Sequence, residues 1–446
     1  MVTKASIQSL AAAIALLVAL CLLLLQGASH DARALETKSF VPGQIIVKLA
    51  PGVGIGEINL RYNTQTQECF ITCSDSPDPR VYLLKISDGA NIEIKLDRLL
   101  SDARVQYAEL NYRSSAPESD APNAQARHSA FPYDSAEPTA DDYSEDAMYP
   151  STALNLAEAQ RITKGAGTTV AILDTGAQLD HPALKTSFEG IPRYDFVSDD
   201  MNPSEPSLAR TTEQRAQEVV GHGTHVAGIV HLVAPAAGLM PLRVLDREGY
   251  GSTFHIAEAV AYADRHDADV INLSLGSPSW SRLLWEQVNQ ATSAGTVVTA
   301  AAGNYNSLEP QYPAASDAVP DTLNDDGLLA VTSVNAKPRK SDFANFGPWV
   351  DIAAPGEKIL STYPVSRYSP SGYAYWTGTS MSAPFVAGEA ALIHNKAGSL
   401  SASGIEGKIR CSARDLPDDP GHIMMGAGHA DVGASLKSIA DSTCVL

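Results

Sequence analysis

The chain has little positive charge and few cysteines, and it has no apolar run long enough to span a membrane comfortably. Its 446 residues include 32 Lys or Arg against 51 Asp or Glu, a formal net charge of −19. Because nucleic-acid binding needs a basic face that neutralises phosphates, this balance argues against a DNA or RNA partner. A hydrophobic content of 44% is sufficient for a sizeable core, and the length predicts more than one folding unit.

The longest apolar run lies near the N-terminus. Leu10–Leu25 is an uncharged stretch of 16 residues, shorter than the roughly 20 residues of a transmembrane helix but typical of a signal peptide. Lys4 precedes it, and Ala32-Arg33-Ala34 offers an A-x-A cleavage site. We therefore predict a cleaved signal peptide over residues 1–34. The protein is then secreted, periplasmic or in the cell envelope, without a stable membrane span; an uncleaved anchor is the alternative.

The five cysteines fit export. Cys21 lies inside the apolar run, while Cys69 with Cys73 and Cys411 with Cys444 form two pairs. An even number in an oxidising compartment favours two local disulfides. Four cysteines could instead bind zinc, but the second pair lacks the short spacing usual in zinc sites.

A small α+β unit is expected over residues 35–113. Alternating, β-branched patterns predict strands at Gln44–Leu49, Val81–Ile86 and Val105–Tyr112, with a helix at Asn91–Leu100. The next stretch, 114–147, has four prolines, eight acidic residues and one arginine. Such a composition cannot bury enough apolar surface to fold, so it predicts a disordered linker open to proteolysis.

From residue 148 to residue 446 the pattern changes to apolar strands alternating with helices. Strands are expected at Thr169–Leu173, Gly238–Leu245, Asp269–Leu275, Thr296–Ala301, Leu329–Val334 and Val350–Ala353, with helices from Val220 onward and at Thr253–His266. This alternation predicts an α/β domain whose parallel sheet is covered on both faces.

Four polar residues lie in glycine-rich frames at the ends of these elements. Asp174 ends the first strand, His222 begins the helix "HGTHVAGIV", Asn304 follows "AAAG", and Ser380 lies in "GTSMSAP". Active groups of a parallel sheet gather beyond the carboxyl ends of its strands. Singly, each residue could be only a cap or a turn residue. A metal site is not expected, because His222 and His225 lack the Glu of an HExxH motif.

Taken together, "ILDTG", "GHGTHVAGI", "NLSLG", "AAAGN" and "GTSMSAPFVAG" closely resemble the five motif blocks of the subtilisin-like serine proteases. The order Asp, His, Ser, with separations of 48 and 158 residues, suits that family; α/β-hydrolases and chymotrypsin-like enzymes use other orders. The resemblance implies a three-layer fold with a mostly parallel central sheet. It also implies a serine endopeptidase that needs no cofactor.

The resemblance assigns catalytic roles residue by residue. Asp174, His222 and Ser380 would form the triad that makes an acyl-enzyme, with the Asn304 amide and the Ser380 N–H as oxyanion donors. Ser380 would start a helix with Pro384 in its first turn, while His225 and Ser382 would be structural. Two alternatives are a catalytically silent binding protein, which the intact triad disfavours, and a serine esterase, which the absence of GxSxG disfavours.

The resemblance also suggests where a peptide substrate binds. In the family, substrates pair as strands with two backbone segments. The matching residues here are Gly249, Tyr250, Gly251, Ser274, Leu275 and Gly276, with Ala302 and Gly303 beside the pocket. Gln311 stands where the family often has glycine at the pocket floor, which predicts a more polar floor. Tyr312-Pro313 is expected to be a cis peptide.

Calcium is a point of departure from the family. The helix after His222 continues without the usual calcium-loop insertion, and the segment that often supplies an Asp ligand is His181-Pro182-Ala183-Leu184. We therefore expect no metal ligands at the usual tight site, although weaker calcium sites stay open.

The N-terminal unit resembles the propeptide of the same family. "VPGQIIVKLAPGV" and "VQYAELNY" are similar to the family's propeptide, a ferredoxin-like inhibitor and folding assistant. The chain is then a monomeric zymogen whose partners are its own propeptide and protein or peptide substrates. A permanently attached accessory domain is the alternative.

Overall fold

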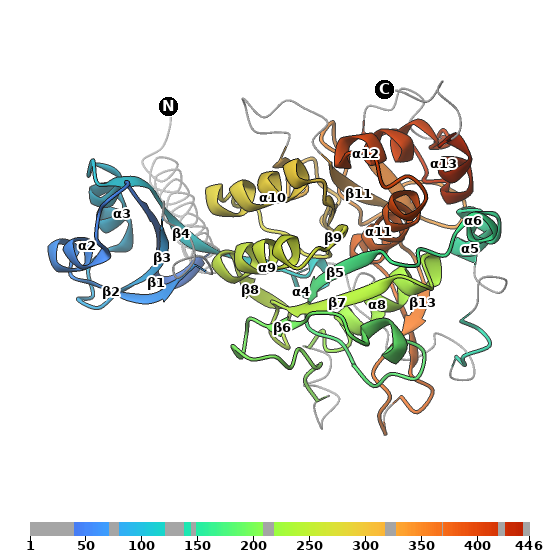
Figure 1. Ribbon diagram of the computed structural model, residues 1–446, viewed down its shortest axis with the longest axis horizontal. Helices are drawn as coiled ribbons and strands as arrows, with labels where there is room; N and C mark the ends of the chain where they lie inside the picture. The colour runs from blue at the N-terminus through green and yellow to red at the C-terminus, as the bar shows by residue number, and fades with distance from the viewer. Residues whose placement is uncertain are drawn as a thin grey trace, which may run out of the picture.

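The computed structural model describes residues 40–70, 80–120, 138–143, 149–207, 218–316, 327–367, 369–417 and 424–439. They form a small N-terminal unit and a larger unit, drawn at the left and right of Figure 1. Strand β4 runs from the first unit to the second, where it pairs with β8. The two units therefore share a sheet, whose order is β2-β3-β1-β4-β8.

The N-terminal unit is an antiparallel sheet with two helices. Its strands are β1 (Phe40–Leu49), β2 (Thr64–Cys69), β3 (Val81–Ile86) and β4 (Val105–Ser115), and its helices are α2 (Ile55–Tyr62) and α3 (Ile92–Leu100). Side chains alternate between the faces, as the period of a strand requires. Ile45 and Leu84 pack in the unit's own core. Ile46 and Leu83 belong instead to a core cluster of the larger unit.

The larger unit is built on a parallel sheet of seven strands in the order β12-β11-β10-β9-β5-β7-β6. These strands are β5 (Thr169–Asp174), β6 (Tyr194–Asp195), β7 (Gly238–Arg243), β9 (Val270–Leu273), β10 (Val297–Ala301), β11 (Leu328–Val334) and β12 (Ile352–Pro355). A hairpin of β13 (Ile359–Thr362) and β14 (Tyr373–Trp376) stands apart from it, and β8 is Tyr250–Ser252.

Helices cover both faces of this sheet. The larger helices are α8 (His222–Val233), α9 (Thr253–Arg265), α10 (Arg282–Ala294) and α11 (Thr379–Lys396); the shorter ones are α4 (Pro117–Asp120), α5 (Tyr149–Ala153), α6 (Leu156–Ile162), α12 (Ala402–Cys411) and α13 (Val432–Ser438). Side chains of α8 and α11 share one core cluster, and those of α9 and α10 share the other. The expected α/β fold with a parallel central sheet is therefore confirmed.

Most predicted elements of both units are present with small shifts at their ends. Strand β2 was missed because it has no apolar alternation, and helix α2 was missed although Ile55, Ile58 and Tyr62 have helical spacing. Helices α10, α12 and α13 and the hairpin of β13 and β14 were not predicted either. The cis peptide at Tyr312-Pro313 is confirmed. Among the described residues, no helix has the length and apolar character to cross a membrane. The predicted signal peptide, Cys73 and Cys444 lie outside the described residues, so cleavage of the signal and both disulfide pairings stay predictions.

The structure corrects the start of the expected linker. Strand β4 continues to Ser115, and α4 follows at Pro117. Ser114, Ser115, Ala116 and Glu118 are buried. The backbones of β8 and Gly276 supply the hydrogen-bond partners that order this stretch, and its polar composition could not reveal such distant partners. Residues 121–137 and 144–147 of the expected linker lie outside the described residues.

Candidate active site

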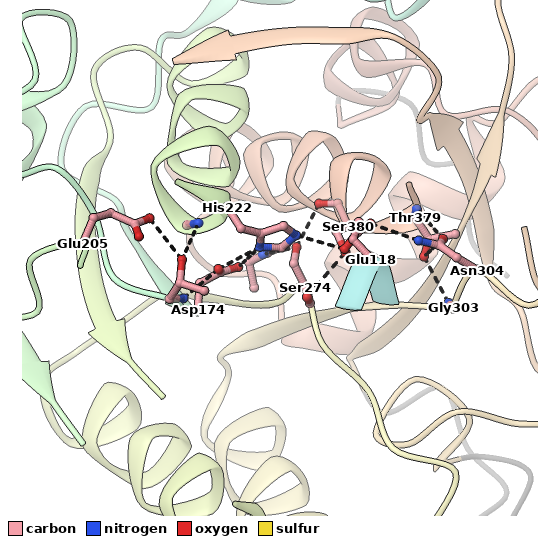
Figure 2. A network of polar contacts seen from close by, with 12 residues as sticks. Glu118, Asp174, Glu205, His222, Ser274, Gly303, Asn304, Thr379 and Ser380 are labelled. Atoms are coloured by element: carbon pink, nitrogen blue, oxygen red, sulfur yellow. Dashed lines mark hydrogen bonds and ion pairs between the residues drawn. The ribbon is translucent and has the colours of Figure 1, made fainter. Parts of the chain in front are cut away.

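The four residues singled out in the sequence meet at one edge of the central sheet (Figure 2). Asp174 is the last residue of β5, and Asn304 follows β10. His222 is the first residue of α8, and Ser380 lies in the first turn of α11. All four are fully buried. The ends of parallel strands and the starts of the covering helices therefore place them together, as expected for such a sheet.

Asp174 holds His222 in a fixed orientation. The Nδ1 atom of His222 lies 2.7 Å from Oδ1 and 2.9 Å from Oδ2 of Asp174. The backbone N–H of Thr175 also donates to Oδ1, at 2.7 Å. Burial alone lowers the pKa of His222, but Asp174 and then Glu118 outweigh it and raise this pKa to about 10. His222 is therefore an imidazolium in this arrangement.

Ser380 and His222 face the same carboxylate oxygen. The Ser380 hydroxyl donates to Oε2 of Glu118 at 2.8 Å, and Nε2 of His222 lies 3.1 Å from the same oxygen. Glu118 comes from α4, in the stretch where a linker was expected. One oxygen of its carboxylate contacts both the hydroxyl and the imidazole, so Glu118 fills space next to the hydroxyl that a substrate would need.

Asn304 points its amide at the other oxygen of that carboxylate. Its Nδ2 donates to Oε1 of Glu118 at 3.0 Å. Its Oδ1 accepts from the backbone N–H and the hydroxyl of Thr379, at 2.9 and 3.0 Å. Because Thr379 can bond only to the amide oxygen in this way, it turns the NH₂ group toward the site.

Two glycines are required by close approaches at this site. A Cβ atom on Gly223 would lie 2.1 Å from the carbonyl oxygen of Gly176, and one on Gly378 would lie 1.8 Å from Oε1 of Glu118. The first glycine lets α8 approach the strand that carries Asp174. The second leaves room for an oxygen atom next to Asn304.

The expected position of Pro384 in the helix is wrong. Helix α11 begins at Thr379, so Pro384 lies beyond its first turn. A residue there would normally donate its N–H to the carbonyl of Ser380, four residues earlier, and proline has no N–H. The Ser274 hydroxyl donates to that carbonyl instead, at 2.9 Å. Ser274 thus satisfies the backbone group that proline leaves free.

The predicted substrate-binding segments both contact the chain's own residues. Ser114 and Ser115 pair with Gly251 and Tyr250, and Ser115 exchanges two backbone hydrogen bonds of 2.9 Å with Gly276. The N–H of Ala116 donates to the carbonyl of Gly249, also at 2.9 Å.

The expected pocket residues lie next to these segments. Gln311 is buried, and a Cβ atom on Gly276 or Gly303 would lie 3.5 or 3.0 Å from its side chain. Leu275 and Ala302 instead point their side chains into a core cluster. These two residues can offer a substrate only their backbone atoms.

His225 and Ser382 have the structural roles expected of them. The Nε2 atom of His225 lies 3.1 Å from the carbonyl oxygens of both Ile359 and Ala374, and burial lowers the pKa of this histidine to about 3. The Ser382 hydroxyl donates to the carbonyls of Ala354 and Pro355. Both residues secure the strands beside the site.

Three site residues were missed by the sequence analysis: Glu118, Thr379 and Glu205. Glu118 looked like one charge in an acidic run, and Glu205 lies in a loop with no helix or strand pattern. Only Thr379 carried a signal, as a small polar residue at a helix start.

Away from this site, Glu68, His255 and Glu258 place three possible metal-ligand atoms within 4.8 Å of one another. His255 there already contacts Glu68 at 2.9 Å.

Comparison with known families and proteins shows what the two units are similar to. The model of the family described as "Subtilase family" matches residues 165–428, and that described as "Fervidolysin N-terminal prodomain" matches residues 27–111. Thermitase of Thermoactinomyces vulgaris is 37% identical over 283 residues, covering 61% of this chain and 90% of that protein. A thermophilic serine proteinase of Bacillus sp. strain AK1 is 32% identical over 369 residues, covering 80% and 79%.

A solved structure supports the fold. Fervidolysin from Fervidobacterium pennivorans matches with a TM-score of 0.71 at 23% identity, covering 90% of this chain and 62% of that one. At this identity the match speaks for the arrangement of both units and not for the chemistry of the site.

Proposed function

The chain belongs to the subtilase family of serine-type endopeptidases, and from that premise we propose that Asp174, His222 and Ser380 hydrolyse peptide bonds through an acyl-enzyme. The protein is a zymogen with its own prodomain. One observation carries the proposal: the Ser380 hydroxyl and His222 Nε2 converge on one oxygen atom, while Asp174 binds the far side of the imidazole.

The chemistry follows from these contacts once a substrate carbonyl replaces the Glu118 carboxylate. A serine hydroxyl is a weak nucleophile at neutral pH, so His222 must be neutral to accept its proton and must later give that proton to the leaving amine. Asp174 fixes the tautomer and stabilises the imidazolium that forms. Attack by Ser380 yields the acyl-enzyme, and a water molecule then releases the second product.

The negative charge of the tetrahedral intermediate needs donors that are already in place. Nδ2 of Asn304 supports this role, because Thr379 holds it toward the site. The N–H of Ser380 is the second donor. It lies in the first turn of α11, where backbone N–H groups have no partner within the helix. Both donors belong to residues that are fully buried in the intact chain, and such donors contribute most where water is excluded.

The substrate is a protein or peptide that binds as an added strand. Gly249–Gly251 and Ser274–Gly276 offer backbone groups to it, and Gln311 makes the adjoining pocket more polar. We further propose that the protein is a secreted monomer that needs no cofactor. N-terminal sequencing of the purified mature protein would locate both the signal cleavage and the maturation point.

Covalent labelling tests the catalytic assignment. The matured wild-type protein should react with a fluorophosphonate probe at Ser380, and Ser380→Ala should abolish labelling. Ser382→Ala is the matched control, because that neighbouring hydroxyl donates to two carbonyls and should leave labelling of the protein intact. Labelling that persists in Ser380→Ala would refute the assignment. Cleavage of a peptide that is lost in Ser380→Ala identifies a protease, whereas turnover of an ester without cleavage of the matching peptide identifies an esterase.

A further inference from the structure

The stretch Arg113–Ala116 lies in the substrate groove as a peptide substrate would. Arg113, Ser114 and Ser115 pair antiparallel with Ser252, Gly251 and Tyr250. On the other side, Ser115 pairs with Gly276. Main-chain pairing of this kind holds an extended peptide whatever its side chains are. The chain therefore blocks the groove with its own residues.

The backbone leaves the groove before it reaches Ser380. Helix α4 begins at Pro117, and the carbonyl of Ala116 accepts from the N–H of Ser119 at 2.9 Å, within the turn that starts this helix. The Glu118 side chain turns into the site instead and is 2% exposed (Figure 2). Its two oxygen atoms accept from three different groups of the site: Ser380, His222 and Asn304.

A carboxylate is a poor target for a nucleophile, since its carbon carries little positive charge. Oε1 stands where the oxyanion would form, beside Asn304, and Oε2 separates the hydroxyl from the imidazole. Its charge adds to that of Asp174, the larger cause, in raising the pKa of His222, and a protonated imidazole cannot accept the proton of Ser380. One side chain thus blocks the oxyanion site and the general base together.

We propose that Glu118 is an intramolecular inhibitor, whose side-chain carboxylate keeps the intact chain inactive by occupying the oxyanion site and binding His222. This inference rests on the proposed function of Asp174, His222 and Ser380. It adds that a side chain blocks the active site of the intact chain. No C-terminal carboxylate produced by cleavage of the chain is needed for this inhibition.

The test measures how fast the intact chain is labelled. Wild type, Glu118→Gln and Glu118→Ala are treated with a fluorophosphonate probe, and intact and matured chains are separated on a denaturing gel. Glu118→Ala should be labelled at least about tenfold faster than wild type, because charge-assisted hydrogen bonds no longer hold the site. Glu118→Gln keeps the shape without the charge and should lie between them.

A matched control and the matured proteins separate the possible failures. Glu93→Gln changes an exposed glutamate of α3 and should leave the rate unchanged. If matured chains are labelled quickly but intact Glu118→Ala and Glu118→Gln are labelled no faster than wild type, the inhibitor role is refuted while the proposed function stands. If matured wild type is not labelled, the proposed function itself has failed.

A second glutamate, Glu205, accepts hydrogen bonds from residues adjacent to Asp174 and His222. Its Oε1 accepts from the hydroxyl of Thr175 at 3.0 Å and from the N–H of Thr224 at 3.1 Å. Its Oε2 accepts from the N–H of Gly221 at 3.0 Å. Gly221 is the N-cap of α8 and has no side chain with which to cap the helix. Glu205 therefore supplies the missing cap from another loop.

These contacts join the two segments that carry the triad acid and base. Thr175 follows Asp174, and its hydroxyl oxygen accepts from the N–H of Gly223 at 3.0 Å. Gly221 and Gly223 flank His222. We infer that Glu205 is a positioning residue, which fixes the start of α8 against the end of β5 and so sets the contact between Asp174 and His222.

Kinetics of the matured enzyme test this inference. Glu205→Ala should lower kcat by about tenfold or more with KM changed less than about twofold, since it disturbs a contact needed for the chemical step. Glu205→Gln keeps an oxygen acceptor for only one of the two backbone N–H groups, and its NH₂ group faces the other, so it should recover part of kcat. The control, Glu189→Gln, alters an exposed glutamate and should match wild type. A wild-type kcat in Glu205→Ala, or no recovery in Glu205→Gln, would overturn the inference.

Discussion

The two units differ in what covers their sheets. The parallel sheet of the larger unit is covered on both faces by helices of that unit. The antiparallel N-terminal sheet covers one face with α2 and α3, while residues of its other face pack in a cluster that contains residues of α9 and α10. The larger unit covers its central sheet with its own helices, whereas the N-terminal unit buries one face of its sheet against the neighbouring unit. Substitutions inside the larger unit should therefore affect catalysis or the stability of its core. Substitutions where the two units touch should affect how tightly the N-terminal unit binds to the larger unit, which we call docking.

The largest effect is expected from Asp174→Asn. Loss of the carboxylate leaves His222 in the wrong tautomer, and kcat of the matured enzyme should fall about ten-thousandfold. Docking of the N-terminal unit should not change, because Asp174 makes no contact with it. Steady-state kinetics and hydrogen exchange at the start of α10 measure the two effects. A kcat within tenfold of wild type would contradict the triad.

Asn304→Ala should have the next largest effect. It removes one oxyanion donor, so kcat should fall about a hundred- to a thousandfold with little change in KM. Asn289→Ala, at an exposed position of α10, is the control and should match wild type. An equal loss in both variants would mean that the effect is not specific to the site.

Glu389→Gln should change how stability depends on pH. Glu389 is fully buried in α11, and burial raises its pKa from 4.5 to about 8. Between these values the unfolded chain has lost the proton that the folded chain keeps, so wild-type stability falls as the pH rises and levels off above about 8. The variant should gain about 2–5 kcal/mol over wild type at pH 9 and nothing at pH 4.

Denaturant unfolding at several pH values measures this difference. The exposed Glu189→Gln is the control and should follow the wild-type curve. A difference between Glu389→Gln and wild type that is the same at pH 4 and pH 9 would show that the titration of Glu389 does not cause it.

The smallest effect is expected from Glu109→Ala at the contact between the units. This buried carboxylate of β4 accepts from the N–H groups of Arg282 and Leu283, at 2.8 and 3.1 Å, and from the hydroxyl of Ser281. It caps α10 from the N-terminal unit. Its loss should weaken docking by about 1–2 kcal/mol and leave kcat of the matured enzyme unchanged.

Hydrogen exchange at Arg282 and Leu283 in the intact chain reports this loss directly. Exchange should become faster in Glu109→Ala and stay as in wild type in Glu93→Gln. Unchanged protection at both amides would show that the cap contributes nothing to docking.

The sequence predicted which four residues meet at the edge of the central sheet, because each of them lies in a local motif. Gly221 and Gly223 frame His222, and the turn at Gly378 places Ser380 at a helix start. The strands that carry Asp174 and Asn304 were visible as apolar runs. The prediction that Pro384 lies in the first turn of α11 was wrong by less than one turn. The helix begins at Thr379, which binds Asn304, 75 residues away, and the local sequence does not show this contact.

Sequence alone determined the family, the α/β architecture, the four polar residues that meet at the sheet edge and the presence of an N-terminal unit, because these depend on local patterns of apolar and glycine residues. Only the tertiary structure decided that Glu118 closes the site and that Glu205 caps α8. Glu118 meets Ser380 across 262 residues of sequence. No local pattern encodes such a contact, because it exists only when β4 pairs with β8 and the chain turns at Pro117 into a site already formed.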